Sequence, residues 1–513
     1  MNIKIKIFVI STFFLLISPL VNVSANIENS EEPLNEVIIN IAQYPQASLS
    51  DITLSMIFQY TWKTQDTIYK FNIREITVEE AAGEGDKPLN IENYDVLIVG
   101  ANYWSYLTHG LNEKLQQNIK QFLSDGGGYL GSCAGTTFAS MGFENPEGVF
   151  EKAANKGVLG IVNVYANEDY FGESQYCSRS ISALPPINLK VESDNTNPIF
   201  NPYTNSHINM TYGGGPGMYE ANNSDSKLGE IVPLLTFDEE LMETKPINWH
   251  LPILPPLFWL QYEKVKTDLL GQYAAIATTY NNTGRIVIFS PHAEIPLYVN
   301  GTMIEYRDKR NTYSSIGKLR QFVYYWNGTK MNESYNYWMH RRSVAWLAGV
   351  TEEDLPPYNQ LRVFIDKPEC RLEPQLYIND TKIIYLDEYG TLRFNYPLLG
   401  EKFDSPLLKI TRFIFRNRQT LSDKLGIRII ERILAKEGRT IVVDDITFDI
   451  YTENCQKVEF YVDDILKHTD YESPFEYKIE KNTYDGVHTV EVRGYDEYGN
   501  YAYETGEYTF KNR

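Results

Sequence analysis

The chain has 513 residues, which is too many for one compact core, so we expect two or three domains. Hydrophobic residues make up 43% and charged residues 22%, a balance that suits a folded globular chain and excludes a disordered one. The formal net charge of −20 makes nucleic acid and anionic membrane surfaces poor partners, and we expect no binding to nucleic acid.

The first 25 residues predict a secretory signal peptide. Lys4 and Lys6 are the charged residues of this segment, an apolar run over 7–21 follows, and 23–25 supplies small residues at the cleavage spacing. A retained membrane anchor is the alternative, although the run is short and contains two serines and a proline. No later segment is long and apolar enough to span a bilayer. We therefore expect an exported protein, either secreted or associated with the cell surface.

Export has consequences for two residue types. Asn-x-Ser/Thr sequons would be glycosylation acceptors in an exported chain. Beyond the signal they begin at Asn209, Asn222, Asn281, Asn300, Asn327, Asn332 and Asn379.

The four cysteines are Cys133, Cys177, Cys370 and Cys455. They are too few for a disulfide scaffold and form no C-x-x-C pair, and the seven histidines are scattered, so we expect no metal site and no cofactor.

The first domain is predicted to span 35–350, and its first part alternates strands with helices. Strands are expected at 37–42, 67–76, 95–100 and 129–132, and helices at 52–62 and 111–123. Short apolar runs such as 95–100 are typical of strands buried on both faces. The alternation predicts an α/β fold, a parallel sheet with helices on both faces.

Strands dominate the next part of this domain. They are expected at 157–166, 187–192, 208–212 and 231–237, with a hairpin of 272–280 and 284–290 around Asn281-Asn282-Thr283. Helices at 315–326 and 334–347 would close the domain. The proline-rich aromatic stretch 246–259 is either an insertion packed on the domain or a lid.

The last third of the chain is predicted to be β-rich, with a connecting region at 357–428. Alternating strands at 440–451, 457–462, 475–480, 488–495 and 503–510 predict a sandwich over 429–511. This stretch resembles the bacterial immunoglobulin-like modules of secreted enzymes and surface proteins. The resemblance implies a spacer or adhesive module, with contacts to surfaces or glycans and no catalysis.

A cysteine lies between two glycines where a strand is expected to meet a helix. Gly131 and Gly135 flank Cys133 in the pattern G-x-C-x-G, the spacing of a nucleophile elbow with Cys in place of Ser. The start of a helix favours the reactive thiolate, and the N–H of Ala134 could donate to an oxyanion. A buried structural cysteine in a glycine-rich turn is the alternative.

A second strand end supplies the residues that a cysteine nucleophile needs. The strand 284–290 runs into Pro291-His292-Ala293-Glu294, and residues two apart at a strand end share one side. His292 would be the base for Cys133, and Glu294 would orient it.

Together these motifs resemble the class I glutamine amidotransferase-like superfamily, and within it the biotin-protein ligase N-terminal-type domain. The resemblance rests on G-S-C-A-G around Cys133, the glycine-rich segment 212–217 and the later S-P-H-x-E, and it covers 35–350. It implies a flavodoxin-like sheet with a catalytic triad of Cys133, His292 and Glu294. Gly213, Gly214 and Gly215 could line the pocket or form a plain turn.

The loop after 95–100 departs from the superfamily pattern. Amidotransferases usually have a glycine-rich oxyanion loop there, whereas this chain has Val99-Gly100-Ala101-Asn102 with one glycine. The N–H of Ala101 or Asn102 is the expected second oxyanion donor.

Three functions follow from these residues. The first is a cysteine hydrolase acting on an amide or peptide-like bond of a small-molecule or peptide-like substrate. The second is a non-catalytic extracellular protein that keeps the pocket for ligand binding or surface attachment. The third is redox sensing or a Cys133–Cys177 disulfide; a Cys370–Cys455 bridge is a separate open pairing.

Overall fold

In the computed structural model we name residues 35–350 the α/β region and residues 361–510 the C-terminal region. The described residues are 35–44, 57–100, 109–146, 149–167, 186–192, 197–240, 269–295, 297–307, 322–330, 336–358, 361–366, 376–378, 381–386, 392–394, 440–442, 446–480 and 482–510. The predicted signal peptide, Ala101, Asn102, Cys177, Cys370 and the stretch 246–259 lie outside these ranges.

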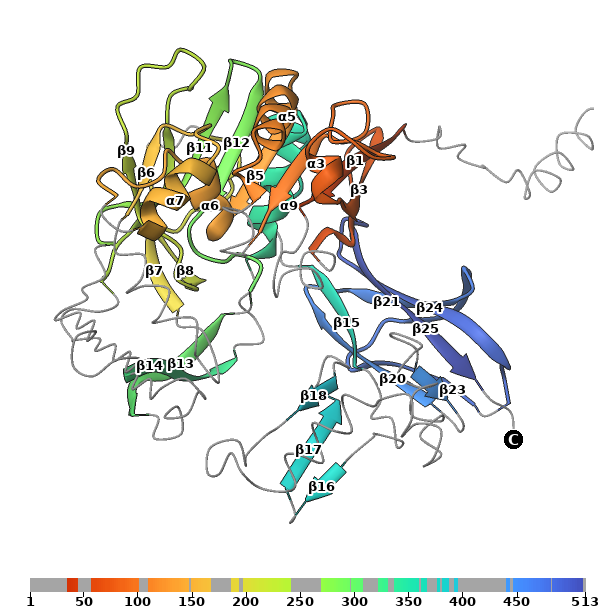
Figure 1. Ribbon diagram of the computed structural model, residues 1–513. Coiled ribbons are helices and arrows are strands. Elements are labelled where there is room, and N and C mark those ends of the chain that lie inside the picture. Colours follow the sequence, from red (N-terminus) through yellow and green to blue (C-terminus); the bar gives the residue numbers. More distant parts are fainter. Residues whose placement is uncertain are drawn as a thin grey trace, which may run out of the picture.

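Five parallel strands form the centre of the α/β region (Figure 1). They are β1 (Asn35–Gln43), β3 (Thr67–Glu75), β4 (Val96–Val99), β5 (Gly128–Ser132) and β12 (Gly284–Phe289). Their pairing gives the spatial order β3-β1-β4-β5-β12, with every neighbour parallel. The carboxyl ends of β4, β5 and β12 therefore lie side by side at one edge of the sheet.

An antiparallel extension makes the sheet mixed. Its strands are β11 (Tyr273–Tyr280), β10 (Val232–Phe237), β9 (Met218–Glu220), β8 (His207–Thr211), β7 (Pro186–Val191) and β6 (Val164–Ala166). The predicted hairpin of β11 and β12 is confirmed. Asn281 and Asn282 take positive φ values of 53° and 59° at its turn, as Asn tolerates.

Helices cover both faces of the parallel strands. They are α3 (Val78–Ala81), α5 (Glu113–Ser124), α6 (Ala134–Ala139), α7 (Val149–Gly157) and α9 (Tyr337–Leu347). Alternate residues of β4 face opposite sides: Leu97 shares one core with Leu115 of α5, whereas Val96 shares the other with Trp338 of α9. The predicted α/β class is thus confirmed, with α9 on the face opposite α5, but the predicted parallel sheet is wrong for β6 to β11, which pair antiparallel.

Two predicted helices end in strands. In the range 52–62, Ile57 and Phe58 are helical as predicted, but β2 (Tyr60–Lys63) begins two residues later. In the range 315–326, the described residues belong to β14 (Phe322–Lys330), which pairs with β13 (Tyr298–Arg307). At these strand positions the apolar spacing suited a helix, but pairing with another strand decides the structure. The predicted strand 157–166 is wrong in its first part. Residue 157 is the last residue of α7, and the strand β6 covers only the last three residues of the predicted range.

The C-terminal region is a pair of packed sheets. One contains β15 (Arg362–Asp366), β20 (Ile446–Glu453) and β23 (Phe475–Ile479). The other contains β19 (Thr440–Val442), β21 (Lys457–Val462), β22 (Ile465–Asp470), β24 (Gly486–Tyr495) and β25 (Tyr501–Phe510). Both sheets contribute to one core around Phe448 and Phe460. The three strands β16 (Leu376–Ile378), β17 (Thr381–Leu386) and β18 (Leu392–Phe394) form a separate small sheet.

The two regions share hydrogen-bonded strands. Strand β2 pairs with β3 on one side and antiparallel with β25 on the other, so that Thr61 lies opposite Tyr501. The N–H of Lys63 donates to Oδ1 of Asn500 at 3.0 Å. Among the described strands, 17 are thereby joined into one sheet that crosses from the α/β region to the C-terminal region.

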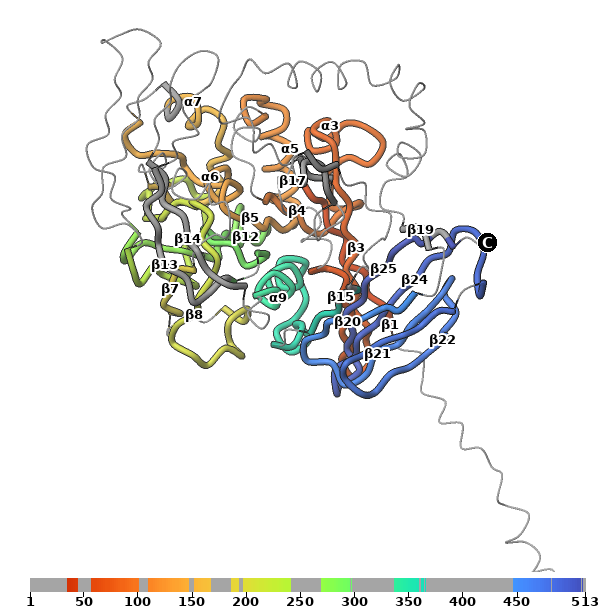
Figure 2. Tube along the Cα trace, turned by 90° about the horizontal axis from the view of Figure 1, so that it is seen from below, coloured from red at the N-terminus to blue at the C-terminus, as the bar shows by residue number. Residues whose placement is uncertain are grey.

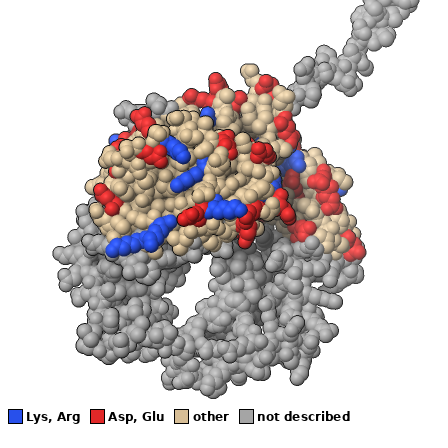
Figure 3. All heavy atoms as spheres, turned by 45° about the horizontal axis from the view of Figure 1, so that its top comes forward, with Lys and Arg blue, Asp and Glu red and all other residues tan. Residues whose placement is uncertain are grey.

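Acidic side chains are spread over the face shown in Figure 3, with lysines and arginines among them. Within the described ranges, no helix has the length and apolarity needed to cross a membrane.

Candidate active site

Cys133 occupies a strained turn between β5 and α6. Its φ of 52° and ψ of −106° lie where non-glycine residues are rarely found, so the surrounding structure must hold it there. Its N–H donates to the carbonyl of Phe289 on β12 at 2.8 Å, and its own carbonyl accepts from the N–H of Thr136 at 3.0 Å. The Cys133 side chain is partly exposed and its thiol is free. The predicted strand-to-helix turn is therefore present.

The two flanking glycines are required by close packing. A Cβ on Gly135 would lie 2.0 Å from the carbonyl oxygen of Val99, at the end of β4. A Cβ on Gly131 would lie 2.9 Å from the backbone of Gly135 itself. The Tyr129 hydroxyl also donates to the carbonyl of Gly135 at 2.7 Å. The G-x-C-x-G spacing thus lets α6 start directly against β4 and fixes the position of Cys133.

His292 and Glu294 follow β12 and lie beside this turn. The parallel pairing of β5 and β12 puts Phe289 opposite Ser132, so both chains leave the sheet at the same edge. The N–H of His292 donates to the carbonyl of Thr211 at 2.8 Å, which fixes its backbone. Its Nδ1 lies 2.7 Å from Oε1 of Glu294, and the ring also interacts electrostatically with the Cys133 side chain. Because Nδ1 faces Glu294, Nε2 is the nitrogen left for the thiol.

The electrostatic interaction between His292 and Glu294 favours the charged form of both side chains. Burial acts to lower the pKa of His292, but the Glu294 carboxylate and Cys133 outweigh it and hold that pKa well above its ordinary value. Burial likewise acts to raise the pKa of Glu294, and its contacts with His292 turn the net change into a lowered pKa. The arrangement therefore favours an imidazolium between a carboxylate and the cysteine.

The three glycines predicted to line the pocket, Gly213, Gly214 and Gly215, lie differently relative to His292. A Cβ on Gly213 would lie 2.4 Å from Nε2 of His292, so this residue lies directly against the nitrogen that faces Cys133. Gly215 packs instead on Ser290, where a Cβ would lie 2.0 Å from the carbonyl oxygen. Gly214 is buried with φ +91°. Of the three, only Gly213 is next to the candidate base.

The expected oxyanion donors are described only in part. Ala134 is the first residue of α6 and directly follows Cys133. Ala101 and Asn102 fall outside the described residues. Where the structure is described, no group of three or more His, Cys, Asp or Glu side chains could hold a metal ion.

One residue beside the site was not predicted. His340 on α9 is completely buried, and its Nε2 lies 3.6 Å from Oε2 of Glu294 and 3.4 Å from the Ser132 hydroxyl. The sequence predicted the helix 334–347, but no motif connects position 340 with position 294. Only the fold brings the two residues together.

Comparison with known proteins gives one family match. Residues 92–323 match the family described as "Biotin-protein ligase, N terminal". This range includes Cys133, His292 and Glu294 and begins just before β4. No curated protein matches the chain.

Solved structures with partial likeness include two that overlap half of the chain. The glutaminase domain of CTPS from Trypanosoma brucei with bound acivicin has 12% identity over 50% of this chain and 86% of its own, with a TM-score of 0.28. A ThuA-like protein from Bacteroides uniformis has 10% identity over 50% of this chain and 82% of its own, with a TM-score of 0.26.

A third likeness covers a shorter part. Fibronectin(III)-like modules of CbhA from Clostridium thermocellum have 21% identity over 15% of this chain and 93% of their own, with a TM-score of 0.14.

Proposed function

We propose that this protein is a secreted, glutamine amidotransferase-like cysteine hydrolase that cleaves an amide or peptide-like bond through Cys133, His292 and Glu294. The observation that carries the proposal is the position of His292, whose Nδ1 lies 2.7 Å from Oε1 of Glu294, at the end of the strand whose Phe289 carbonyl binds the N–H of Cys133. A cysteine nucleophile needs such a base, and the base needs an orienting carboxylate.

The chemistry follows from these positions. The Cys133 sulfur attacks the substrate carbonyl, and the proton of the thiol is held by His292. The N–H of Ala134 stabilises the resulting oxyanion, with a second donor from Ala101 or Asn102. His292 then gives its proton to the leaving amine, and the amine departs from the acyl-enzyme. Water, deprotonated by His292, hydrolyses the thioester and frees Cys133.

The other regions have proposed roles of their own. The predicted signal peptide would export the chain, and glycosylation at its sequons would follow. The C-terminal region would act as an immunoglobulin-like spacer or surface contact. N-terminal sequencing of protein recovered from the medium tests export directly: a mature chain that begins after Ala25 is expected, and a chain retained in the cell with Met1 would contradict it.

The triad is tested by the reactivity of Cys133. Iodoacetamide labelling of the full chain, followed peptide by peptide, is expected to modify Cys133 first. His292→Ala should slow this labelling by on the order of tenfold or more, because the thiolate loses its counter-ion.

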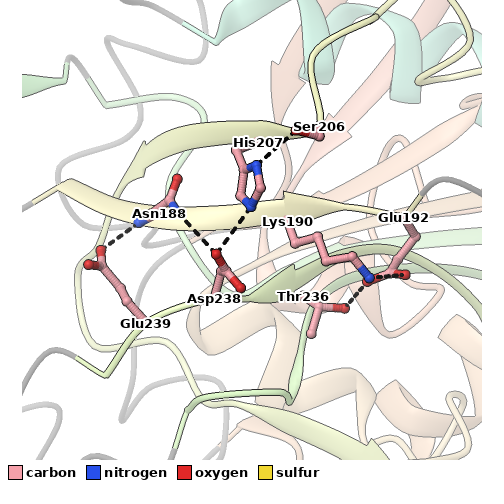
Figure 4. Close-up of polar contacts among 8 residues, drawn as sticks. All are labelled: Asn188, Lys190, Glu192, Ser206, His207, Thr236, Asp238 and Glu239. Atoms are coloured by element: carbon pink, nitrogen blue, oxygen red, sulfur yellow. Dashed lines mark hydrogen bonds and ion pairs between the residues drawn. The ribbon is translucent and has the colours of Figure 1, made fainter.

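A matched control exists on another part of the sheet. His207 on β8 reaches across β7 to Asp238, with Nε2 3.1 Å from the carboxylate, and both side chains are largely exposed (Figure 4). His207 begins β8, four residues before Thr211, whose carbonyl accepts from the N–H of His292. His207→Ala removes the exposed histidine–carboxylate pair and leaves that contact in place, so the labelling should be unchanged. Labelling of Cys133 that is slow in the wild type and indifferent to His292→Ala would contradict the proposed triad.

The alternative is a non-catalytic binding protein, and one observation favours it. The loop after β4 has a single glycine, Gly100, where amidotransferases usually have a glycine-rich oxyanion loop. Intact-mass measurement with a panel of amide and γ-glutamyl peptides separates the two functions. An acyl adduct on Cys133 is expected from a hydrolase, whereas binding without an adduct or product supports the alternative.

A further inference from the structure

A fourth side chain, His340, completes the surroundings of the candidate triad. It lies on α9, which packs against β5 and β12 on the face opposite α5 (Figure 2). The ring stacks on Phe289, with centroids 5.6 Å apart and planes at 16°. Its Nε2 is close to two residues of the site, Ser132 at 3.4 Å and Glu294 at 3.6 Å. His340 thus touches both the residue before Cys133 and the carboxylate that faces His292.

Glu294 has one carboxylate oxygen that His292 does not use. Oε1 is bound by His292, whereas Oε2 is buried and has no hydrogen-bond partner among the described residues. Leaving a buried charged oxygen without a partner is unfavourable. The nitrogen that faces it is Nε2 of His340, at a separation where the attraction is electrostatic and a small movement would form a hydrogen bond.

His340 is best suited to this contact as a neutral ring. Burial lowers its pKa, the charge of Glu294 acts in the opposite direction, and the charge of His292 lowers it further. These two residues are the charged groups that act on the ring, and the hydroxyl of Ser132 is its remaining polar neighbour. A neutral ring with its proton on Nε2 directs a positive dipole at Oε2 without competing with His292 for the full charge of the carboxylate.

The helix that carries His340 is fixed by the next two residues. Arg341 donates from Nε to the carbonyl of Ile57 and from Nη1 to that of Leu361, each at 2.9 Å. Arg342 donates from Nε to the carbonyl of Ile199 at 2.8 Å. These bonds anchor α9 to three separate segments, so the distance from His340 to Glu294 is set by the fold.

We infer that His340 is a positioning residue that holds Glu294 against His292 and thereby maintains the reactivity of Cys133. The inference rests on the proposed function. It acts through Glu294 and not through the substrate, so its signature is a change in the pH dependence of Cys133. A histidine that merely fills the core would leave that dependence unchanged.

The test measures the rate of Cys133 alkylation by iodoacetamide from pH 5 to pH 10 in the full chain. His340→Phe keeps a ring over Phe289 and removes both nitrogens. It should move the pH of half-maximal rate upward by about one unit. At pH values well below this midpoint, the alkylation rate should then be lower by about tenfold. His340→Gln places an amide nitrogen near the position of Nε2 and should restore most of the wild-type profile.

Two further variants keep the test decisive. Ser343→Ala changes a buried hydroxyl one turn along the same helix and should leave the profile unchanged. If His340→Phe does not fold, His340→Asn replaces it, because its amide reaches the position of Nδ1 but not that of Nε2.

The outcomes separate this inference from the proposed function. A His340→Phe or His340→Asn profile that superimposes on the wild type, while His292→Ala slows labelling, overturns the role of His340 alone. Labelling that is indifferent to His292→Ala overturns both.

Discussion

Cys133 in the α/β region and Cys455 in the C-terminal region have opposite surroundings. Cys133 is partly exposed on a turn with φ 52° and interacts electrostatically with His292. The Cys455 sulfur lies 3.7 Å from the carbonyl of Arg362 and 3.8 Å from that of Glu453, and burial raises its pKa to about 12. Both thiols are free. The comparison teaches that the position of a cysteine relative to strand ends and a base, not its presence, determines its chemistry.

The largest expected difference concerns Cys455. With a pKa of about 12, its thiolate at pH 7 should be roughly a thousandfold rarer than that of an ordinary cysteine. Its iodoacetamide labelling should therefore be slower by about that factor than that of N-acetylcysteine, and should rise about tenfold per pH unit. Unfolding in urea should remove the difference. Rapid labelling of folded Cys455 at pH 7 would remove the contrast between the two regions.

The next largest effect concerns glycines. Gly135→Ala would push a Cβ to within 2.0 Å of the Val99 carbonyl oxygen, and should cost about 3 kcal/mol of the free energy of unfolding. Gly499→Ala in the C-terminal region meets nothing within 4 Å and strains only a φ of +84°, so about 1 kcal/mol is expected. Urea titration of both variants gives the comparison. Equal costs would show that the turn at Cys133 is not limited by packing.

A smaller effect is expected at the junction of the regions. Asn500 is buried, accepts from the Lys63 N–H at 3.0 Å and donates to Asp496 at 2.8 Å. Asn500→Ala should cost about 1–2 kcal/mol, because it leaves the Lys63 N–H without its acceptor. Hydrogen exchange should then quicken in β2 while β5 stays protected. Unchanged exchange at Lys63 would contradict a role for Asn500 in joining the regions.

The smallest effects are two pH dependences of opposite sign. Burial gives His340 a lowered pKa, so its neutral form is the stable one, and stability is lost as the pH falls below about 6.5. His488 has a raised pKa because it bonds Asp463 at 2.6 Å, so its contribution is present below about pH 6.5 and lost as the pH rises through the folded pKa. Urea titrations of His340→Gln and His488→Gln from pH 5 to pH 8 should give opposite trends against the wild type. Parallel trends would be inconsistent with both assignments.

The sequence predicted those features that depend on local patterns. The strand before Cys133 and the strand before His292 are short apolar runs bounded by turn residues, so both strand ends could be located. Their parallel pairing then explains why the two side chains meet. The elbow spacing and the H-x-E strand end predicted the roles of Cys133, His292 and Glu294, and the resemblance to the amidotransferase-like superfamily implied the same triad.

Features that depend on distant partners were missed. Tyr60–Lys63 is a strand because it pairs with β3 and β25, and residue 502 is far from residue 60 in the sequence. His340 meets Glu294 only after α9 packs on β5 and β12. Neither contact can be predicted from the local sequence. Hydrophobic periodicity indicates which face of an element is buried, but not which other element packs on that face.

The pairing of β2 with β25 has a consequence for any attempt to separate the two regions. Cutting the chain between them would leave the backbone N–H and C=O groups of β2 without partners on that side, next to the buried rings of Tyr60 and Trp62. Open strand edges of this kind are templates for aggregation. The isolated halves should therefore precipitate or bind each other again, whereas the intact chain covers its own edge.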